Sequence, residues 1–288
     1  MNNSYKKIQV EPIAEALGAE ISGVDLSNLD TDSYAEIRQA FRQYSVIFFR
    51  DQVLSPDQHV AFAERWGEIN INRFFKPLDT HPKIATVIKE PDQTVNIGGN
   101  WHTDHSYDQI PALGSILLAR EVPPIGGDTH FSSMYKAYDA LSPGLQKTLE
   151  SLSAWHSSRH AFGKMTVSDD NKADDRLSNS DLATQDALHP VIIAHPETGR
   201  KALYVNADFT VKIDGWTEQE SKPLLEYLYT HGQRAEFTCT FQWQKHSIAI
   251  WDNRATWHNA VNDYHGYRRV MHRITLDGVP LRAAASVQ

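Results

Sequence analysis

The spacing of hydrophobic residues changes several times along this chain. Apolar side chains three to four positions apart predict a helix over residues 31–44. A Ser-Pro pair at residue 55 is a typical helix start, and that helix is expected to run to about residues 66–67. A Thr-Glu-Gln-Glu capping box at residue 217 predicts a helix to residue 231. Two more helices are expected at 133–141 and 143–153.

Most of the other apolar segments are short and rich in β-branched and aromatic residues, which favours strands. The predicted strands cover residues 45–49, 115–122, 129–131, 190–195, 201–206, 236–243, 247–252 and 267–276, and residues 8–28 are expected to form short strands and turns. This pattern suggests a closed or double-sheet β core with helices packed outside it, in one domain over residues 1–288. The polar stretch 164–186 predicts a surface loop, either a lid or an insertion without a catalytic role.

Charge and cysteine content narrow the possible partners. The formal net charge is −8 and no block of five basic residues occurs, which argues against nucleic acid as the main partner. An anionic small molecule stays possible, because local arginines can oppose the global charge. Cys239 is the single cysteine, so no intrachain disulfide can form, and its strand-like surroundings predict a buried spectator. No secretory signal and no membrane span are visible, which favours a cytoplasmic location.

Histidine and acidic residues could form a metal site. With 14 His and 36 Asp and Glu residues, about two His-x-acid pairs are expected by chance, and two occur. His195 and Glu197 lie in a Pro- and Gly-containing turn, so that pair is interpreted as exposed turn chemistry. His102 and Asp104 would share one face of an extended segment and could chelate a metal together. The alternative is a hydrogen-bonded pair at a strand edge.

Three residues further along the chain could complete such a site. His258 follows a predicted strand and turn; two imidazoles and one carboxylate can bind one face of Fe(II) and leave the other face open. A histidine of this kind is also compatible with a core position. Arg269 and Arg273 are four residues apart on a predicted strand, which places them on the same face. They could form an outward basic stripe, but neither face of this strand is cleanly apolar, which favours a strand that lines a polar cavity.

The chain resembles the taurine dioxygenase / 2,4-dichlorophenoxyacetate dioxygenase family of iron- and 2-oxoglutarate-dependent oxygenases. Several motifs carry the resemblance in family order: Leu17 to Leu26, Asn100 to Asp104, Gly126 to Thr129, Leu203 to Asn206, Trp251 to Asn253 and His258 to Arg273. Other segments resemble the branch that acts on (R)-dichlorprop-type aryloxyalkanoates: Ser133 to Tyr135, His156 to Ser158 and Ser221 to Leu225.

The resemblance implies a double-stranded β-helix, or jelly roll, and a reaction that uses Fe(II), 2-oxoglutarate and O2 and releases succinate and CO2. It implies that His102, Asp104 and His258 are the iron ligands, with no catalytic residue beyond them. Thr129 and Arg269 are expected to hold the remote carboxylate of 2-oxoglutarate, because arginine offers a two-pronged partner. Trp251 is expected to pack beside the co-substrate or in the core. Relatives are commonly dimers or tetramers, so a homo-oligomer is expected.

The resemblance also indicates where the substrate binds. Arg273 matches the position that receives the substrate anion, and it could also help to hold 2-oxoglutarate. Polar residues that contact taurine in the family are replaced here by Asn72, Phe75, Gly98 and Ala161, while aromatic residues remain at Phe162 and Phe209. These changes argue against taurine and favour a small organic acid with an apolar or aromatic body, hydroxylated with or without C–O bond cleavage. The alternatives are a natural-product hydroxylase or desaturase, an alkylsulfate or sulfonate dioxygenase, and a non-catalytic jelly-roll binding protein.

Overall fold

One large mixed sheet dominates the protein. The computed structural model describes residues 5–162, 177 and 180–284. The strand order in the large sheet is β1-β2-β3-β15-β7-β17-β6-β5, and β4 also pairs with β17. Its strands are β1 (Gln9–Pro12), β2 (Ala19–Ser22), β3 (Val46–Phe49), β4 (Ile69–Asn70), β5 (Pro77–Leu78), β6 (His81–Lys89), β7 (Gly114–Glu121), β15 (Ile248–Asp252) and β17 (Arg269–Leu276).

Three smaller sheets complete the β structure of the described residues. The first is β14 (Thr238–Phe241), β8 (Thr129–Ser133) and β16 (Thr256–Ala260). The second is β10 (Asp186–Pro190), β9 (Ser153–Ser157) and β13 (Thr210–Ile213). The third is β12 (Lys201–Leu203), β11 (Ile192–Ala194) and β18 (Arg282–Ala283).

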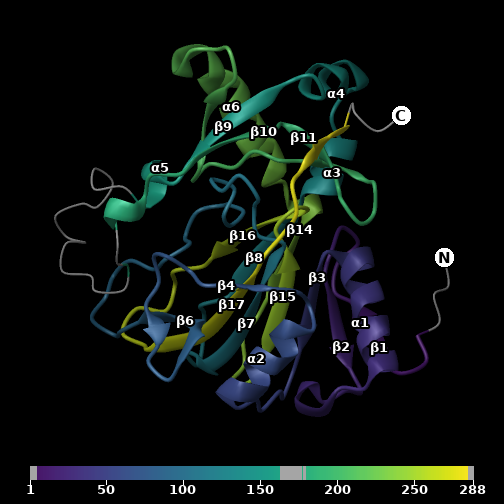
Figure 1. Cartoon of the computed structure of the whole chain (residues 1–288), viewed down its shortest axis with the longest axis vertical. Helices are drawn as coiled ribbons and strands as arrows, with labels where there is room; N and C mark the ends of the chain where they lie inside the picture. Colours follow the sequence, from purple (N-terminus) through teal and green to yellow (C-terminus); the bar gives the residue numbers. More distant parts are fainter. Residues whose placement is uncertain (1–4, 163–176, 178–179, 285–288) are drawn as a thin grey trace.

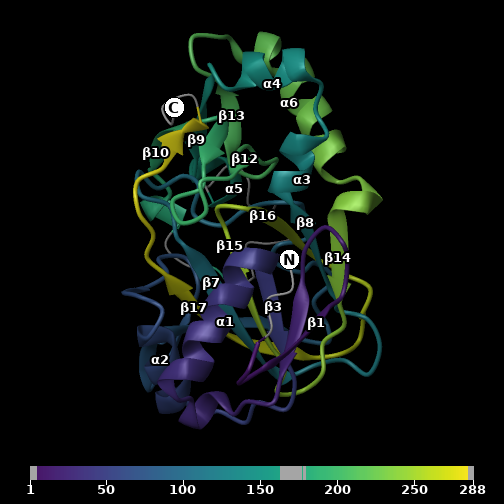
Figure 2. The same ribbon diagram turned by 90° about the vertical axis from the view of Figure 1, so that its right-hand side faces the viewer.

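Helices pack outside the strands, as expected from the pattern of the sequence. Helices α1 (Thr31–Tyr44) and α2 (Pro56–Glu64) cover the large sheet, while α3 (Met134–Asp139), α4 (Pro143–Leu149) and α6 (Glu218–Gly232) lie at the opposite end with the second and third small sheets (Figures 1 and 2). Shorter helical turns are α5 (Arg159–Phe162), η1 (Leu26–Asn28), η3 (Ser180–Leu182) and η4 (Ala235–Phe237). None of the described helices is both long and apolar enough to cross a membrane.

The large sheet and the β14-β8-β16 sheet face each other across an aromatic core. Phe48 of β3 stacks on Phe241 of β14, with ring centroids 4.1 Å apart. Phe131 of β8 meets Phe48 and Trp251 at 5.6 and 5.8 Å. Two sheets packed in this way form the expected jelly roll, because each sheet buries its apolar face against the other.

The predicted elements agree with the structure where local capping decides the bounds. The helix at 31–44 is confirmed at both ends, and the helix after Thr217 begins with the predicted capping box. The helix predicted at 143–153 ends at Leu149, because β9 begins at Ser153 and pairs with β10 and β13. The nine-residue strand β6 was not predicted, although its sequence contains Ile, Thr and Val.

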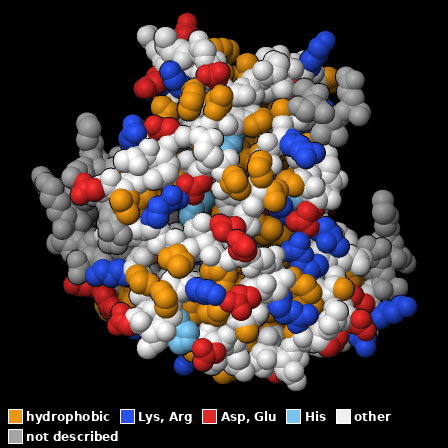
Figure 3. Space-filling view, viewed as in Figure 1, with side chains coloured by type: hydrophobic (Ala, Val, Ile, Leu, Met, Phe, Trp, Pro, Cys, Tyr) orange, Lys and Arg blue, Asp and Glu red, His pale blue; other side chains and the backbone are white. Residues whose placement is uncertain are grey.

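The loop predicted at 164–186 is only partly within the described residues. Residues 163–176, 178 and 179 lie outside them. The described end is not a plain loop: it contains η3 and the first residue of β10, and Leu177 forms an isolated β-bridge with Phe75. On the molecular face in Figure 3, basic and acidic side chains are interspersed, in keeping with the absence of a basic block from the sequence.

Candidate metal and co-substrate site

Backbone pairing brings together two histidines that are far apart in the sequence. The N–H of His102 donates to the carbonyl of His258 at 3.1 Å, and the N–H of His258 donates back at 2.8 Å. This pairing is a single bridge and Asp104 lies in a turn, so the extended segment considered for His102 and Asp104 is not a regular strand. The chain turns after Asp104, where His105 adopts a left-handed backbone with φ of 58°. The turn still leaves Asp104 facing both imidazoles.

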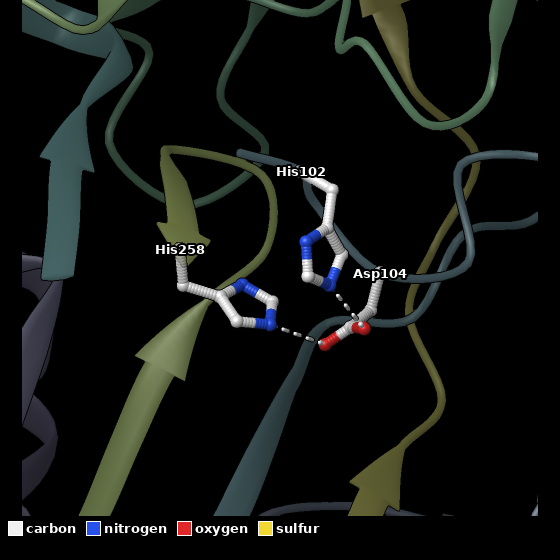
Figure 4. A group of neighbouring side chains, drawn as sticks. All are labelled: His102, Asp104 and His258. Carbon is white, nitrogen blue, oxygen red and sulfur yellow. Dashed lines mark ion pairs between the residues drawn. The ribbon is translucent and has the colours of Figure 1, made fainter. Parts of the chain in front are cut away.

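The side chains of His102, Asp104 and His258 converge on one point (Figure 4). The Nε2 atom of His102 lies 3.6 Å from Oδ1 of Asp104, and the Nε2 atom of His258 lies 3.6 Å from Oδ2. All three residues are buried, and their potential ligand atoms lie within 4.8 Å of one another. Two nitrogens and one oxygen in this arrangement could hold a divalent metal ion.

The protonation states suit metal binding. Burial, together with the nearby His102, holds the pKa of His258 well below its usual range, so its imidazole is neutral at pH 7. Burial opposes the ionisation of Asp104, but the Arg273 guanidinium and the two imidazoles together outweigh burial and hold the pKa of this carboxyl well below its usual range. The Nδ1 atom of His102 lies 2.8 Å from the carbonyl oxygen of Asn100, which accepts only from a protonated nitrogen. Burial disfavours protonation of His102, but Asp104 and Asp208 outweigh burial and raise the pKa of its ring. In the neutral ring that metal binding requires, Nε2 keeps its lone pair toward Asp104.

Arg273 lies beside the three converging residues. Its Nη2 atom is 2.7 Å from Oδ2 of Asp104, an ion pair whose atoms are not aligned for a hydrogen bond. Its Nε donates to Ser115 at 3.2 Å, and its Cζ lies 5.7 Å from the ring of Phe75 and 5.9 Å from that of Trp251. These contacts hold the guanidinium in place with donors still directed into the site.

Arg269 lies on the same strand as Arg273 and is buried without a carboxylate partner among the described residues. Its Nε and Nη2 atoms have no hydrogen-bond partner, and burial lowers the pKa of its guanidinium. Leaving these two buried guanidinium nitrogens without a hydrogen-bond acceptor is costly, which indicates that an anion binds beside Arg269. Unpartnered atoms on Arg269, Arg273 and Asp104 thus fit both a metal ion and an acidic co-substrate.

Trp243 connects Thr129 with Arg269 and was not predicted from the sequence. Its Nε1–H donates to the Thr129 hydroxyl oxygen at 2.9 Å, and the Arg269 guanidinium lies 5.7 Å from its ring. Because Thr129 accepts from Trp243, its own O–H is left to donate to another group. No local signal reveals this contact, since the two residues are separated by 114 positions. Trp251, which was predicted beside the co-substrate or in the core, is buried and packs on His258, with ring centroids 4.8 Å apart.

Aromatic side chains form one wall next to His102. Phe162 stacks on Phe74 at 4.3 Å, and Phe209 lies 5.8 Å from Phe162 and 6.3 Å from the His102 ring. Tyr107, a further residue that was not predicted, packs against Phe209 at 4.9 Å. The predicted residues Phe162 and Phe209 are therefore close together, in the same aromatic cluster.

The other predicted pocket residues lie around this wall. A Cβ on Gly98 would lie 3.3 Å from the His102 ring, and the φ of 78° there also favours glycine. The Asn72 amide oxygen accepts from the backbone N–H groups of Phe74 and Phe75, and its nitrogen lies 3.3 Å from Nε2 of His105. Asn72 thus shapes the chain that carries Phe75.

The prediction of an exposed turn for the second His-x-acid pair is right for Glu197, which is exposed in a turn, but wrong for His195. His195 is buried and its Nε2 lies 3.0 Å from Oδ2 of Asp252. Arg254 donates to both oxygens of Asp252 and to Glu197, which also pairs with Arg38. The backbone turns at this point, but the His195 side chain points inward to the buried Asp252, whose charge Arg254 compensates.

Comparison with known proteins identifies the family. Residues 9–275 match the family model described as "Taurine catabolism dioxygenase TauD, TfdA family". The chain belongs to the TauD/TfdA family. This TauD/TfdA chain is 34% identical over 288 residues to an alkylsulfatase of Acinetobacter baylyi, covering 96% of the chain and 87% of the relative. It is 29% identical over 280 residues to the (S)-phenoxypropionate/alpha-ketoglutarate-dioxygenase of Sphingobium herbicidovorans, covering 96% and 97%.

Solved structures of TauD/TfdA proteins share the fold. A putative alpha-ketoglutarate-dependent taurine dioxygenase from Burkholderia xenovorans superposes with a TM-score of 0.81 at 36% identity, covering 96% of this chain and 94% of that one. AAD-2, solved with Mn(II) and N-oxalylglycine, gives 0.80 at 26% identity, covering 96% and 100%. The protein is therefore an alpha-ketoglutarate (2-oxoglutarate)-dependent dioxygenase that uses Fe(II), 2-oxoglutarate and O2.

Proposed function

We propose that His102, Asp104 and His258 bind Fe(II), and that Thr129 and Arg269 bind the remote carboxylate of 2-oxoglutarate. The three converging donor atoms and the unpaired N–H groups of Arg269 support these assignments. The iron would supply the activation of O2 that oxidises an unreactive C–H bond. For each hydroxylation, 2-oxoglutarate, O2 and R–H give succinate, CO2 and R–OH.

The substrate proposed is an organic anion with an apolar or aromatic body. The single observation that carries this proposal is the position of Arg273 next to both Asp104 and an aromatic ring, that of Phe75. Arg273 would bind the substrate anion by charge-assisted hydrogen bonds. Phe162 and Phe209 would contact the body and exclude water from the reacting carbon.

With its anionic group on Arg273, the substrate would place the carbon next to that group beside the proposed Fe(II) site. If that carbon carries an ether oxygen, its hydroxylation gives a hemiketal or hemiacetal, which collapses with cleavage of the C–O bond. Aryloxyalkanoic acids have this connectivity, and two relatives are named (S)-phenoxypropionate dioxygenases. The proposed reaction is therefore hydroxylation of an aryloxyalkanoate-like acid with release of a phenol.

A second candidate is an alkyl sulfate ester. The relative with 34% identity is an alkylsulfatase, and another, from Pseudomonas putida, is a sulfate ester dioxygenase. In an alkyl sulfate the carbon bound to the ester oxygen would be hydroxylated, which releases an aldehyde and sulfate. Arg273 suits either anion, so the aromatic wall distinguishes the candidates: it favours a flat body over a flexible alkyl chain.

The test is turnover of a defined panel by the full-length protein with Fe(II), 2-oxoglutarate and O2. The panel contains both phenoxypropionate enantiomers, a medium-chain alkyl sulfate and taurine, and the assays are for succinate, phenol, aldehyde and sulfite or sulfate. Phenol release in step with succinate supports the aryloxyalkanoate proposal, whereas sulfate release with aldehyde supports the second candidate. Turnover of taurine alone contradicts both.

We further propose that the whole chain is one catalytic domain that works in the cytoplasm as a dimer or tetramer. The family match over residues 9–275 supports a single domain, and the single cysteine suits a reducing compartment. Light scattering during gel filtration tests the oligomeric state, and a monomer would contradict it. The proposed lid at 164–186 falls largely outside the described residues and stays a prediction.

A further inference from the structure

The Leu203–Asn206 motif ends in an asparagine that reaches two parts of the site at once. Asn206 is fully buried. Its side-chain nitrogen donates to the Ser106 hydroxyl at 3.0 Å, and its side-chain oxygen accepts from the backbone N–H of Phe209 at 3.0 Å. Ser106 belongs to the metal loop, defined here as residues 102–108, and Phe209 belongs to the aromatic wall.

Ser106 is also held from a second direction. Its hydroxyl lies 3.1 Å from Nδ1 of His156, which in turn lies 3.3 Å from the hydroxyl of Thr210. The Thr210 hydroxyl accepts from the backbone N–H of Asn206 at 2.9 Å, so the contacts form a closed ring. All of these residues are buried, where an unpaired polar group is costly and each bond restricts its neighbours.

Both ends of Asn206 act close to the metal-binding residues. Ser106 follows Asp104 by two positions, in the turn that directs the carboxylate toward the imidazoles. The turn that Asn206 caps also carries Asp208, whose Oδ2 lies 3.7 Å from Nδ1 of His102. Phe209, at the end of that turn, packs 6.3 Å from the His102 ring. A shift of Asn206 would therefore move both the carboxylate loop and the surroundings of His102.

We propose that Asn206 is a positioning residue that fixes the metal loop relative to the aromatic wall, acting through Ser106. Asn206 would touch neither the metal nor the substrate. This inference rests on the proposed assignment of His102, Asp104 and His258 as metal ligands. This role gives the Leu203–Asn206 motif a function. Asn206 follows strand β12, and the nitrogen and oxygen of its side-chain amide bond to different partners.

The test measures Co(II) binding to the full-length, metal-free protein by calorimetry, with the Co(II) absorption spectrum as a second readout. Ser106→Ala removes the hydroxyl, and Asn206→Leu removes both amide bonds with little change in volume. Each variant is expected to weaken Co(II) affinity by about tenfold or more, as for groups that orient metal ligands, and to alter the spectrum. The double variant is expected to be no worse than Asn206→Leu alone, because Asn206 acts on the metal loop through Ser106.

Ser221→Ala is the matched control. Ser221 is equally buried, donates to the Thr217 carbonyl at 2.8 Å and accepts from the N–H of Ile213 at 3.0 Å, far from the metal loop in helix α6. This variant is expected to lose stability but to bind Co(II) with unchanged affinity and spectrum. If Ser106→Ala and Asn206→Leu lower the melting temperature in the same way and leave Co(II) binding unchanged, Asn206 is only structural and the proposal is overturned.

Two further outcomes also decide the matter. Additive losses in the double variant contradict an action of Asn206 through Ser106. Asp104→Ala, measured in parallel, separates this inference from the proposed function. If wild-type protein binds Co(II) and Asp104→Ala does not, the metal site exists, and unchanged binding in the Asn206 variant then contradicts the positioning role alone. If wild-type protein takes up no Co(II), both proposals fail.

Discussion

Two buried clusters in this protein contain the same kinds of residues. One contains His102, Asp104, His258 and Arg273. The other contains His195, Asp252, Arg254 and Glu197. Each has a His-x-acid pair with a nearby arginine, and each lies away from solvent apart from a partly exposed Glu197. In this protein, residue type, spacing and burial therefore do not distinguish a metal site from a cluster of charged residues that only stabilises the fold.

The two clusters differ in whether their polar atoms have partners. Asp252 accepts from His195 and doubly from Arg254, and Nδ1 of His195 accepts from two backbone N–H groups. In the first cluster, Oδ2 of Asp104 and Nη2 of Arg273 have no hydrogen-bond partner, and both histidines keep a nitrogen facing Asp104. A satisfied cluster supports the fold, while an unsatisfied one indicates a missing ligand.

Removing Asp104 should have the largest effect. Asp104→Ala is expected to reduce turnover on the order of a thousandfold or more, because a metal ligand is lost from an open site. The fold should persist, since Oδ2 of Asp104 accepts no hydrogen bond and the backbone bridge between His102 and His258 does not depend on this carboxylate. Succinate release and circular dichroism measured on the same preparation check both statements. Retained turnover would refute the ligand assignment.

The structural cluster should respond in the opposite way. Arg254→Ala leaves the buried Asp252 and the half-buried Glu197 without their main partner, which should lower the free energy of unfolding by about 3–5 kcal/mol. Metal uptake by the folded protein should persist. Arg268→Ala is the matched control: Arg268 also pairs with two glutamates, Glu90 and Glu121, but at the surface, so its loss should cost about 1 kcal/mol or less. Equal losses of unfolding free energy for Arg254→Ala and Arg268→Ala, measured by urea unfolding, would show that burial does not set the contribution of these ion pairs.

Sequence patterns predicted the elements whose bounds depend on local chemistry. The helix over 31–44 is capped by Asp30, and the helix after Thr217 has its capping box, so both agree with prediction. The family motifs identified the residues that converge at the site, because their order along the chain is specific. In both cases the information is carried by neighbouring residues.

Contacts between distant segments could not be predicted in the same way. Trp243 meets Thr129 because the pairing of β14 with β8 sets their register. Asn206 meets Ser106 although the two residues are 100 positions apart and neither lies in a strand. The inward direction of His195 depends on Asp252, which is 57 residues away. Asp104 faces both imidazoles from a turn and not from an extended segment, because a single bridge to His258, rather than a full ladder, holds this part of the chain. Spacing in the sequence does not reveal these tertiary effects.

Arg269 tests whether unpaired N–H groups indicate a ligand. Arg269→Lys keeps the charge but removes the fork, so 2-oxoglutarate affinity should fall by about ten- to a hundredfold, the loss of one charge-assisted hydrogen bond. Titration of the Co(II)-loaded protein with 2-oxoglutarate measures this change. Arg268→Lys is the matched control, since the neighbouring side chain points to the surface and pairs with glutamates. Unchanged affinity in Arg269→Lys would move the carboxylate site elsewhere.

His59 shows that unpaired atoms alone do not make a ligand site. Both its ring nitrogens are buried without a partner, but the titratable groups that act on it are Arg120 and His272, and no carboxylate joins them among the described residues. Burial, reinforced by these two groups, lowers the pKa of His59 to about 3. A neutral imidazole in a basic environment does not favour the binding of a metal ion. Removal of His59 is therefore expected to change only the stability of the protein.

The sign of that effect follows from proton binding. The unfolded chain protonates His59 near pH 6.5, while the folded protein does so only near pH 3, so the unfolded state binds the extra proton between these values. Stability contributed by His59 is present above pH 6.5 and is lost as the pH falls, by at most about 1.4 kcal/mol per pH unit. His59→Leu should flatten the fall of the unfolding free energy between pH 6.5 and 4, measured by urea titration. Equal slopes in wild type and His59→Leu would show that the pKa of this buried histidine is not lowered in the folded protein.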